Sequence, residues 1–429
     1  MLQWEYHNIS RSKDELFMNY STLTQLMEPN ESTLGRDIDP LSVYALFEHI
    51  KDKRKKRGVR YPMAFILTLI LLAKLAGETT LAGVADWVRL RGDDLQKALP
   101  GTRGTFPCAA TYSNVLRAID AEQLPHILTQ GLLRMEAAVR CEDEPSRFVG
   151  QKEREKHVHI AMDGKTLRGT LSHEAEDQKK MHQVTLYEPQ TGLILKEQVV
   201  GEKQNELSLL SEFLLEKWVK GRILTVDALF TQHTFCSSVT RWGGEYMVIA
   251  KGNQPTLLDD LRLFFDEPPT DCRDWRTACT HDKGHGRLEQ RSIIATTELN
   301  DFLSTWAGIA QVFCITRVVK EKGKERREVV VGITSLPPAK ADAHQLLTLN
   351  RDHWKIENRL HWRRDVTLQE DHCQVRKGVA PRILALLNSF LLSLLDFLGV
   401  ENVAKQARIF DAKPAVALRL LLGPLPTFK

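Results

Sequence analysis

The sequence predicts an α/β protein in which a helical N-terminal region precedes a mixed sheet flanked by helices. Apolar residues recur at helical spacing from about residue 37 to 140, whereas short strand-like apolar runs alternate with amphipathic stretches after residue 157. The later region has the order β-β-β-α-β-α-β, which is typical of a mixed sheet covered by helices.

The chain has 429 residues, enough for two or three domains. The patterns divide it into a polar extension (1–36), a helical domain (37–140), a polar linker (141–156), an α/β domain (157–400) and a C-terminal tail (401–429). Charged loops and strand-like pieces interrupt the α/β domain at about 255–340. The helical pattern resumes at 343–371, and a very apolar helix at 380–399 closes the core.

Four helices are predicted in the N-terminal region. One opens at Asp39-Pro40, and others cover 79–91 and 110–124. The apolar run 61–77 is interrupted by Lys74 and is shorter than the ~20 residues of a membrane span, so we predict a buried helix.

A basic run, KDKRKKRGVR, lies between the first two of these helices and contains Lys55 and Arg57. It is either a solvated basic loop or a segment that contacts phosphates, and the two interpretations are equally supported.

The seven cysteines include no CxxC pair, and no signal peptide is recognisable, so we expect a reducing cytoplasm. Cys272, Cys279, His281 and His285 lie near one another along the chain. Their spacing fits no standard zinc pattern, so a metal site there is a weak alternative.

In the α/β domain, strands are predicted at 157–163, 182–188 and 193–200, with the turn PQTG between the last two. An amphipathic helix follows at 206–219. The pattern continues with a strand, a helix and a strand at 222–230, 231–243 and 245–252.

Asp163 and Asp227 each follow an apolar strand, as IAMD and LTVD. If these strands are parallel neighbours, both carboxylates lie together at the carboxyl edge of the sheet, where open α/β sheets bind ligands. Two close carboxylates repel unless a cation compensates, and oxygen ligands favour Mg²⁺ or Mn²⁺. The alternatives are an Asp-Gly hairpin turn at Asp163 and a helix N-cap at Asp227.

A third carboxylate is expected in the charged helical stretch 349–372, where Glu357 has apolar neighbours. On one helix face it is accompanied by His353, His361 and Arg364. Three ligands over eight residues would span about 12 Å, too far for one zinc ion. Arg364 is a candidate for holding a phosphate, and the alternative is a salt-bridged surface helix.

Two tryptophans flank Glu357 on this stretch. We expect Trp354 and Trp362 to lie in the core rather than to stack on bases.

The strings IAMDGKTLRGT, LTVDALFTQ and HWKIENRLHWRRDVTLQED together resemble the DDE transposases of the H-repeat-associated (Rhs-linked) bacterial insertion-sequence family. KGHGRLEQR (283–291) and the helical region around 61–87 are similar to the same family. The resemblance covers roughly residues 40–400.

This resemblance implies a ribonuclease H-like catalytic core, with 255–340 as a β-rich insertion between the second Asp and the Glu. Its catalytic and metal-binding triad would be Asp163, Asp227 and Glu357. Two Mg²⁺ or Mn²⁺ ions about 4 Å apart would clamp a scissile DNA phosphate. Asp163 would bridge both ions, while Asp227 and Glu357 would each hold one.

One part of the related pattern is absent. Related families carry a Tyr and an Arg seven and four residues before the Glu, where this chain has Asn350 and His353. The basic position after the Glu is filled by Arg364, and His353 and Arg351 are candidates to substitute for the missing Tyr and Arg. The alternatives for the third ligand are Asp365, Glu370 and Asp371.

Several basic side chains are predicted to contact DNA. They are Lys165 and Arg168 after the first Asp, Lys251 at a strand end, His285 and Arg287 on a glycine-flanked loop, Arg364, and Lys55 with Arg57 in the basic run. For the loop residues, a plain charged turn is equally well supported.

The function implied is DNA transposition: binding of an insertion sequence's ends, metal-dependent phosphodiester cleavage and strand transfer. The expected partners are terminal inverted repeats, bound by 37–140, and target DNA, with a homodimer on DNA, no membrane and a bacterial cytoplasmic, nucleoid-associated location. The alternatives are a domesticated non-catalytic DNA-binding relative and a metal-dependent nuclease without strand transfer.

Overall fold

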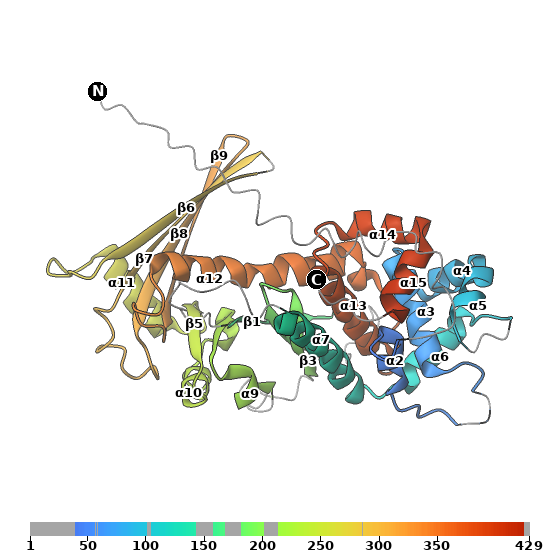
Figure 1. Cartoon of the computed structure of the whole chain (residues 1–429). Helices are drawn as coiled ribbons and strands as arrows, with labels where there is room; N and C mark the ends of the chain where they lie inside the picture. Colours follow the sequence, from blue (N-terminus) through green and yellow to red (C-terminus); the bar gives the residue numbers. More distant parts are fainter. Residues whose placement is uncertain are drawn as a thin grey trace. The chain divides into compact units, whose positions relative to one another are not determined.

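The computed structural model describes residues 39–55, 57, 59–100, 104–142, 158–167, 182–200, 213–284 and 286–423. These residues form an α/β protein with a large mixed sheet and an N-terminal helical region, as the sequence predicts (Figure 1). The chain divides into two compact units. One contains residues 1–120, 133–145 and 394–429, and the other contains 121–132 and 146–393.

The first unit is helical and is built around α3 (Met63–Leu75), whose residues are all buried. The expected buried helix at 61–77 is therefore confirmed. The helices of this unit include α2 (Val43–Glu48), α4 (Leu81–Leu90), α5 (Gly92–Ala98), α6 (Ala109–Ala118), α14 (Val403–Ala412) and α15 (Pro414–Leu422). The segment predicted as a tail thus contains two helices, and both pack against α3 because their apolar faces need cover.

A further helix, α7 (Gln123–Glu142), contributes residues to both units. The sequence did not predict it, because its apolar spacing overlaps the end of the helix predicted at 110–124.

The second unit contains a nine-stranded sheet in the order β3-β2-β1-β4-β5-β9-β8-β7-β6. The first five strands are β1 (Val158–Thr166), β2 (His182–Glu188), β3 (Leu193–Val200), β4 (Arg222–Val226) and β5 (Glu245–Ala250). They are followed by β6 (Arg276–Gly284), β7 (Arg287–Thr296), β8 (Gln311–Glu321) and β9 (Lys324–Thr334).

The pairing in this sheet is mixed. β1, β4 and β5 are parallel neighbours, and the other pairings are antiparallel. The predicted order of strands and helices is confirmed, although 206–212 of the predicted helix lie outside the described residues and the helix α9 covers only Glu216–Val219. The stretch 255–340 begins with α11 (Pro255–Asp266), and its strands join the core sheet by pairing β9 with β5.

One face of the sheet is covered by α12 (Ala343–Lys355), which starts at a capping box formed by Asp342 and Gln345 (Figure 1). Its first turns bury Leu346 and Leu347 against Ile293 and Ile315 of β7 and β8. The opposite face is covered in part by α10 (His233–Arg241), whose Cys236 lies beside Tyr246 of β5.

After Lys355 the helix changes its hydrogen bonding. Ile356–His361 and Arg363–Thr367 are π-helical, and Glu370–His372 form a short 3₁₀ turn. The helical pattern at 343–371 is confirmed, but periodicity cannot distinguish an α-helix from a π-helix. Turns of the π type are rare and are frequently found at functional sites.

The apolar helix predicted near the C-terminus is α13 (Ala380–Phe397). By length and composition it could cross a membrane, but 89% of its apolar window is buried inside the protein. A mostly buried core helix of a globular domain meets the same criteria of length and composition.

Candidate functional site

The parallel register of β1 and β4 brings the two predicted aspartates to neighbouring positions. Met162 lies opposite Val226, and Asp163 and Asp227 follow directly. β1 itself runs on through Asp163 to Thr166, paired with β2. Asp163 is therefore neither in a hairpin turn nor at the strand's end. It lies where the pairing with β4 stops.

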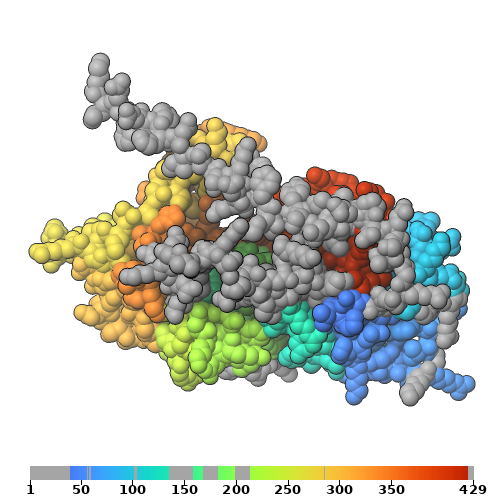
Figure 2. Space-filling view, viewed as in Figure 1, coloured from blue at the N-terminus to red at the C-terminus, as the bar shows by residue number. Residues whose placement is uncertain are grey.

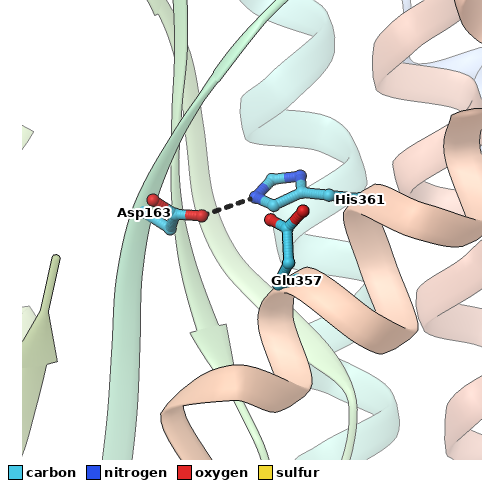
Figure 3. A group of neighbouring side chains, drawn as sticks. All are labelled: Asp163, Glu357 and His361. Carbon is cyan, nitrogen blue, oxygen red and sulfur yellow. Dashed lines mark ion pairs between the residues drawn. The ribbon is translucent and has the colours of Figure 1, made fainter. Parts of the chain in front are cut away.

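Asp163 forms a cluster with two side chains of the first π-helical segment, Glu357 and His361 (Figure 3). The donor atoms of these three residues all lie within 4.8 Å of one another. The Oδ2 atom of Asp163 is 3.2 Å from Nε2 of His361. Glu357 is exposed, whereas His361 is buried, so the cluster lies at the sheet surface beneath the helix.

The electrostatics of this cluster favour a charged Asp163. Burial alone would raise the pKa of its carboxyl, but the His361 imidazole and the Gly164 N–H oppose burial and hold that pKa below its usual value. Both ring nitrogens of His361 are buried, and neither has a hydrogen bond of good geometry among the described residues. A buried imidazole whose Nε2 faces the Asp163 carboxylate, with Glu357 beside it, is a suitable donor set for a divalent cation.

Asp227 occupies the N-cap position of a 3₁₀ turn, Ala228–Phe230, but its side chain makes no capping hydrogen bond. Its Oδ1 instead accepts a hydrogen bond from Nζ of Lys251 at 3.1 Å. Both side chains are about half-exposed. The N-cap alternative therefore explains the position of Asp227 but not the orientation of its carboxylate.

A buried hydrogen-bonded row underlies the two aspartates. Thr225 Oγ1 lies 2.8 Å from His159 Nε2 and 2.9 Å from His353 Nδ1. Burial lowers the pKa of His159 to about 3, so this ring is neutral. Burial also lowers the pKa of His353, while the charges of Asp163 and Asp227 act in the opposite direction. This row fixes α12 to β1 and β4 directly below the carboxylates.

Lys165, two residues after Asp163 on the same face of β1, is buried and pairs with Asp365. Its Nζ lies 2.6 and 2.5 Å from the two carboxylate oxygens. Asp365, one of the alternative third ligands, is thus engaged by a lysine, and the structure groups Glu357 with Asp163 instead.

Arg364 has no exposed surface and lies inside the second unit. Its guanidinium donates to Glu370, to Glu197 and to Gln183. Because both carboxylates are buried, Arg364 is needed inside the protein to neutralise them. The prediction that Arg364 holds a DNA phosphate is therefore wrong for this structure, and Glu370 is equally unavailable as a metal ligand.

Two further expectations concern the tryptophans. Trp354 is 47% exposed and Trp362 is 53% exposed, so the prediction that both belong to the core is wrong. They lie on the side of the helix that faces away from the sheet, whereas His353 and His361 lie on its buried side.

The remaining residues predicted to contact DNA lie in different parts of the chain. Lys55 and Arg57 are exposed in the first unit, while Arg168 and His285 lie outside the described residues. Arg287 starts β7, and its Nε is 3.6 Å from Glu289. The alternative metal site formed by cysteines and histidines between 272 and 285 gains little support. The Sγ atom of Cys279 lies 3.9 Å from Nε2 of His281, and both side chains are on an exposed strand.

His361 was not predicted as a site residue. Its position, four residues after Glu357, does predict that both side chains leave the same side of a helix. Three ligands from one helix lie too far apart for one ion, but Asp163 on β1 forms a compact set with Glu357 and His361.

Comparison with known proteins agrees with this geometry. The family described as Transposase DDE domain matches residues 154–394, which is more than half of the chain, and the family described as DDE_Tnp_1-associated matches residues 44–130. The Escherichia coli K12 protein named "H repeat-associated putative transposase YhhI" is 26% identical over 360 residues, covering 82% of this chain and 90% of that protein. "Putative transposase YncI" of Escherichia coli O157:H7 is 26% identical over 376 residues, covering 86% and 92%. With Asp163 and Glu357 brought together inside the matched segment, the chain belongs to the Transposase DDE domain family.

Proposed function

We propose that this protein is the DNA transposase of an insertion sequence, which cleaves phosphodiester bonds at the element's ends and joins them to target DNA. Family membership and the names of the relatives support a transposase role. The observation that carries the proposal is the cluster of Asp163, Glu357 and His361, with Asp227 at the neighbouring strand position. The same arrangement supports a ribonuclease H-like core.

The donor set suits a divalent metal. Asp163, Glu357 and Asp227 offer carboxylate oxygens, which Mg²⁺ and Mn²⁺ prefer, and His361 offers a buried nitrogen that lacks a good hydrogen bond. When bound, such ions lower the pKa of an attacking water or 3′-hydroxyl and stabilise the leaving oxygen. We propose two ions, which Asp163, Asp227 and Glu357 would hold.

The surrounding residues hold this site rigid. The row of His159, Thr225 and His353 fixes the helix over the strands, and the low pKa of His159 keeps a competing positive charge away from the metal ligands. Lys251 neutralises Asp227 in the free protein. Lys165, two residues after Asp163 on the same face of β1, would contact a scissile-strand phosphate once Asp365 releases it.

The test is cleavage of a duplex that carries the gene's own flanking sequence, with Mg²⁺ or Mn²⁺. Asp163→Asn, Asp227→Asn and Glu357→Gln should each abolish cutting while DNA binding stays nearly unchanged, because each removes a metal ligand and little else. Asp259→Asn, at an exposed position of α11, is the matched control. Wild-type cutting by Asp227→Asn would overturn the assignment of the site.

A strand-transfer assay with a pre-cut end separates the remaining possibilities. Joining of that end to a target plasmid supports a transposase, whereas cutting without joining supports a nuclease. Binding without any cutting would favour a domesticated DNA-binding relative.

We propose that the helical first unit binds the terminal repeats and that two copies act together on two ends. The exposed Lys55 and Arg57 are the proposed phosphate contacts. Lys55→Ala with Arg57→Ala should weaken binding to the element end more than cutting of bound DNA. Unchanged affinity would contradict this role.

A further inference from the structure

The outer half of the β6–β9 strands carries a basic surface on the same face of the sheet as α12. In the inner half, Ile293, Ile315 and Val330 pack beneath α12. Alternate positions toward the hairpin ends stay on this face. At these positions Arg291 of β7 lies opposite Arg317 of β8. Arg287 of β7 lies opposite Glu321 of β8, which in turn lies opposite Lys324 of β9. The hairpin ends, yellow and orange in the figures, project beyond α12 (Figures 1 and 2).

A single buried carboxylate organises this surface. Glu289 is 5% exposed, and its two oxygens each lie 3.1 Å from a guanidinium nitrogen of Arg317. Arg291 and Arg287 also form ion pairs with it. Glu289 therefore holds three arginines in place. Arg317 also pairs with Glu328 at 3.4 Å, so three guanidinium groups and two carboxylates leave this group with a net charge of +1.

The hairpin of β8 and β9 adds further cations to this surface. Its turn holds Lys322 at a φ of 48° and Gly323 at a φ of 74°. Lys324, Arg326 and Arg327 form no ion pair within 4.0 Å among the described residues. With Arg287 and Arg317 they line a groove of about 620 Å³.

The basic surface continues to the carboxylate cluster. Asp282 of β6, on the same face, lies 3.6 Å from Arg291 and 2.9 Å from Arg351 of α12. Arg351 is about half-exposed and precedes Glu357 on the same helical segment. The basic side chains thus lead from the hairpin ends along α12 toward Asp163 and Glu357.

We propose that this surface, the arginine face (Arg287, Arg291, Arg317, Lys324 and Arg326), binds the phosphate backbone of duplex DNA and guides it to the carboxylate cluster. The inference rests on the proposed function and names where that function's substrate lies. Guanidinium groups bind phosphates in two-pronged geometry, and the face has almost no apolar side chain, which a protein partner would need at the centre of its interface. Glu289 is a positioning residue for this face.

The test measures binding of the full chain to a fluorescent duplex of the gene's flanking sequence by anisotropy, across a series of salt concentrations. Lys324→Ala with Arg326→Ala should reduce the slope of log K against log salt by about 1.8, at about 0.9 per phosphate contact. The matched control is Lys283→Ala with Lys320→Ala, which removes the same charge from the opposite face of the sheet, on β6 and β8. It should keep the wild-type slope.

An unchanged slope in the first double variant, or an equal loss in the control, would overturn the proposal. Glu289→Gln is a second variant. It should reduce the slope while circular dichroism shows a folded chain, and a folded variant with the wild-type slope would contradict the positioning role. Cleavage by wild type is measured in parallel: if it fails, the proposed function fails, but the slope comparison still decides the arginine face.

Discussion

The Oδ2 atom of Asp163 on β1 lies 3.2 Å from Nε2 of His361 on the π-helical segment, although the two residues are far apart in the sequence. This contact joins the strand carrying one proposed metal ligand to the turn carrying another, Glu357. It also explains how a buried carboxylate keeps a pKa below its usual value. His361 is therefore the residue whose removal should disturb the cluster most directly.

We predict that His361→Ala lowers metal-dependent cleavage by about 10–100-fold, the usual cost of losing a residue at or beside a metal. DNA binding without metal should remain. The measurement is cleavage rate against Mn²⁺ concentration. His344→Ala, at an exposed position of α12, is the control and should leave the rate unchanged. Wild-type metal dependence in His361→Ala would exclude His361 from the site.

Asp365→Asn should strengthen DNA binding. Lys165 is paired with Asp365, so neutralising that carboxylate leaves the ammonium free for a phosphate. The salt slope should rise by about 0.9, the value for one further phosphate contact. The gain should disappear when Lys165→Ala is added. A gain that persists in the double variant would show that Lys165 is not the phosphate contact.

Arg364→Met should destabilise the folded protein by about 3–5 kcal/mol, because it leaves Glu370 and Glu197 buried without their cation. Arg364→Lys should recover only part of this loss, since lysine cannot make the forked contact. Denaturant unfolding measures both. Arg262→Met, at an exposed position of α11, should change stability by about 0.5 kcal/mol or less. Similar stability of Arg364→Met and wild type would contradict the buried role.

The buried carboxyl of Glu197 makes the free energy of unfolding depend on pH in a predictable direction. Burial raises the pKa of its carboxyl to about 7, against the opposing effects of the Arg364 charge and the Ser389 hydroxyl. The folded chain then holds this proton more tightly than the unfolded chain, whose glutamate pKa is about 4.3. Stability is therefore lost as pH rises from about 4.3 to about 7.

Glu197→Gln should remove that loss. Between pH 5 and pH 8, the free energy of unfolding of the variant should rise relative to wild type, by about 1.4 kcal/mol for each pKa unit removed. Glu216→Gln, at an exposed position of α9, should follow the wild-type profile. Parallel profiles for Glu197→Gln and wild type would show that Glu197 is already charged at neutral pH.

Much of the second unit could be predicted from local patterns. Short apolar runs located β1, β4 and β5. The sequence placed Asp163 and Asp227 together on the condition that their strands are parallel neighbours, and the structure shows that pairing. The family resemblance supplied Glu357, which the structure groups with Asp163. These features depend on residues close in sequence or on motifs long enough to be specific.

The rest depends on contacts between distant segments. A helix rich in charges has the same sequence pattern whether its arginine faces solvent or two buried glutamates. The burial of Arg364 could therefore not be predicted without knowing that Glu197 of β3 lies beside it. The prediction that Trp354 and Trp362 are buried was wrong for a related reason. Tryptophan is usually buried, but the side of the helix that faces the sheet is occupied by His353 and His361. The joining of β9 to β5 has no local signature either.

The position of Glu357 on a late segment has a consequence for synthesis of the protein. Asp163, Asp227 and the strands of the arginine face all precede it, and 130 residues separate Asp227 from Glu357. At about 5–20 residues per second, a ribosome needs roughly ten seconds to cover that interval. The carboxylate cluster therefore cannot be complete on a nascent chain until the segment that carries Glu357 has been translated.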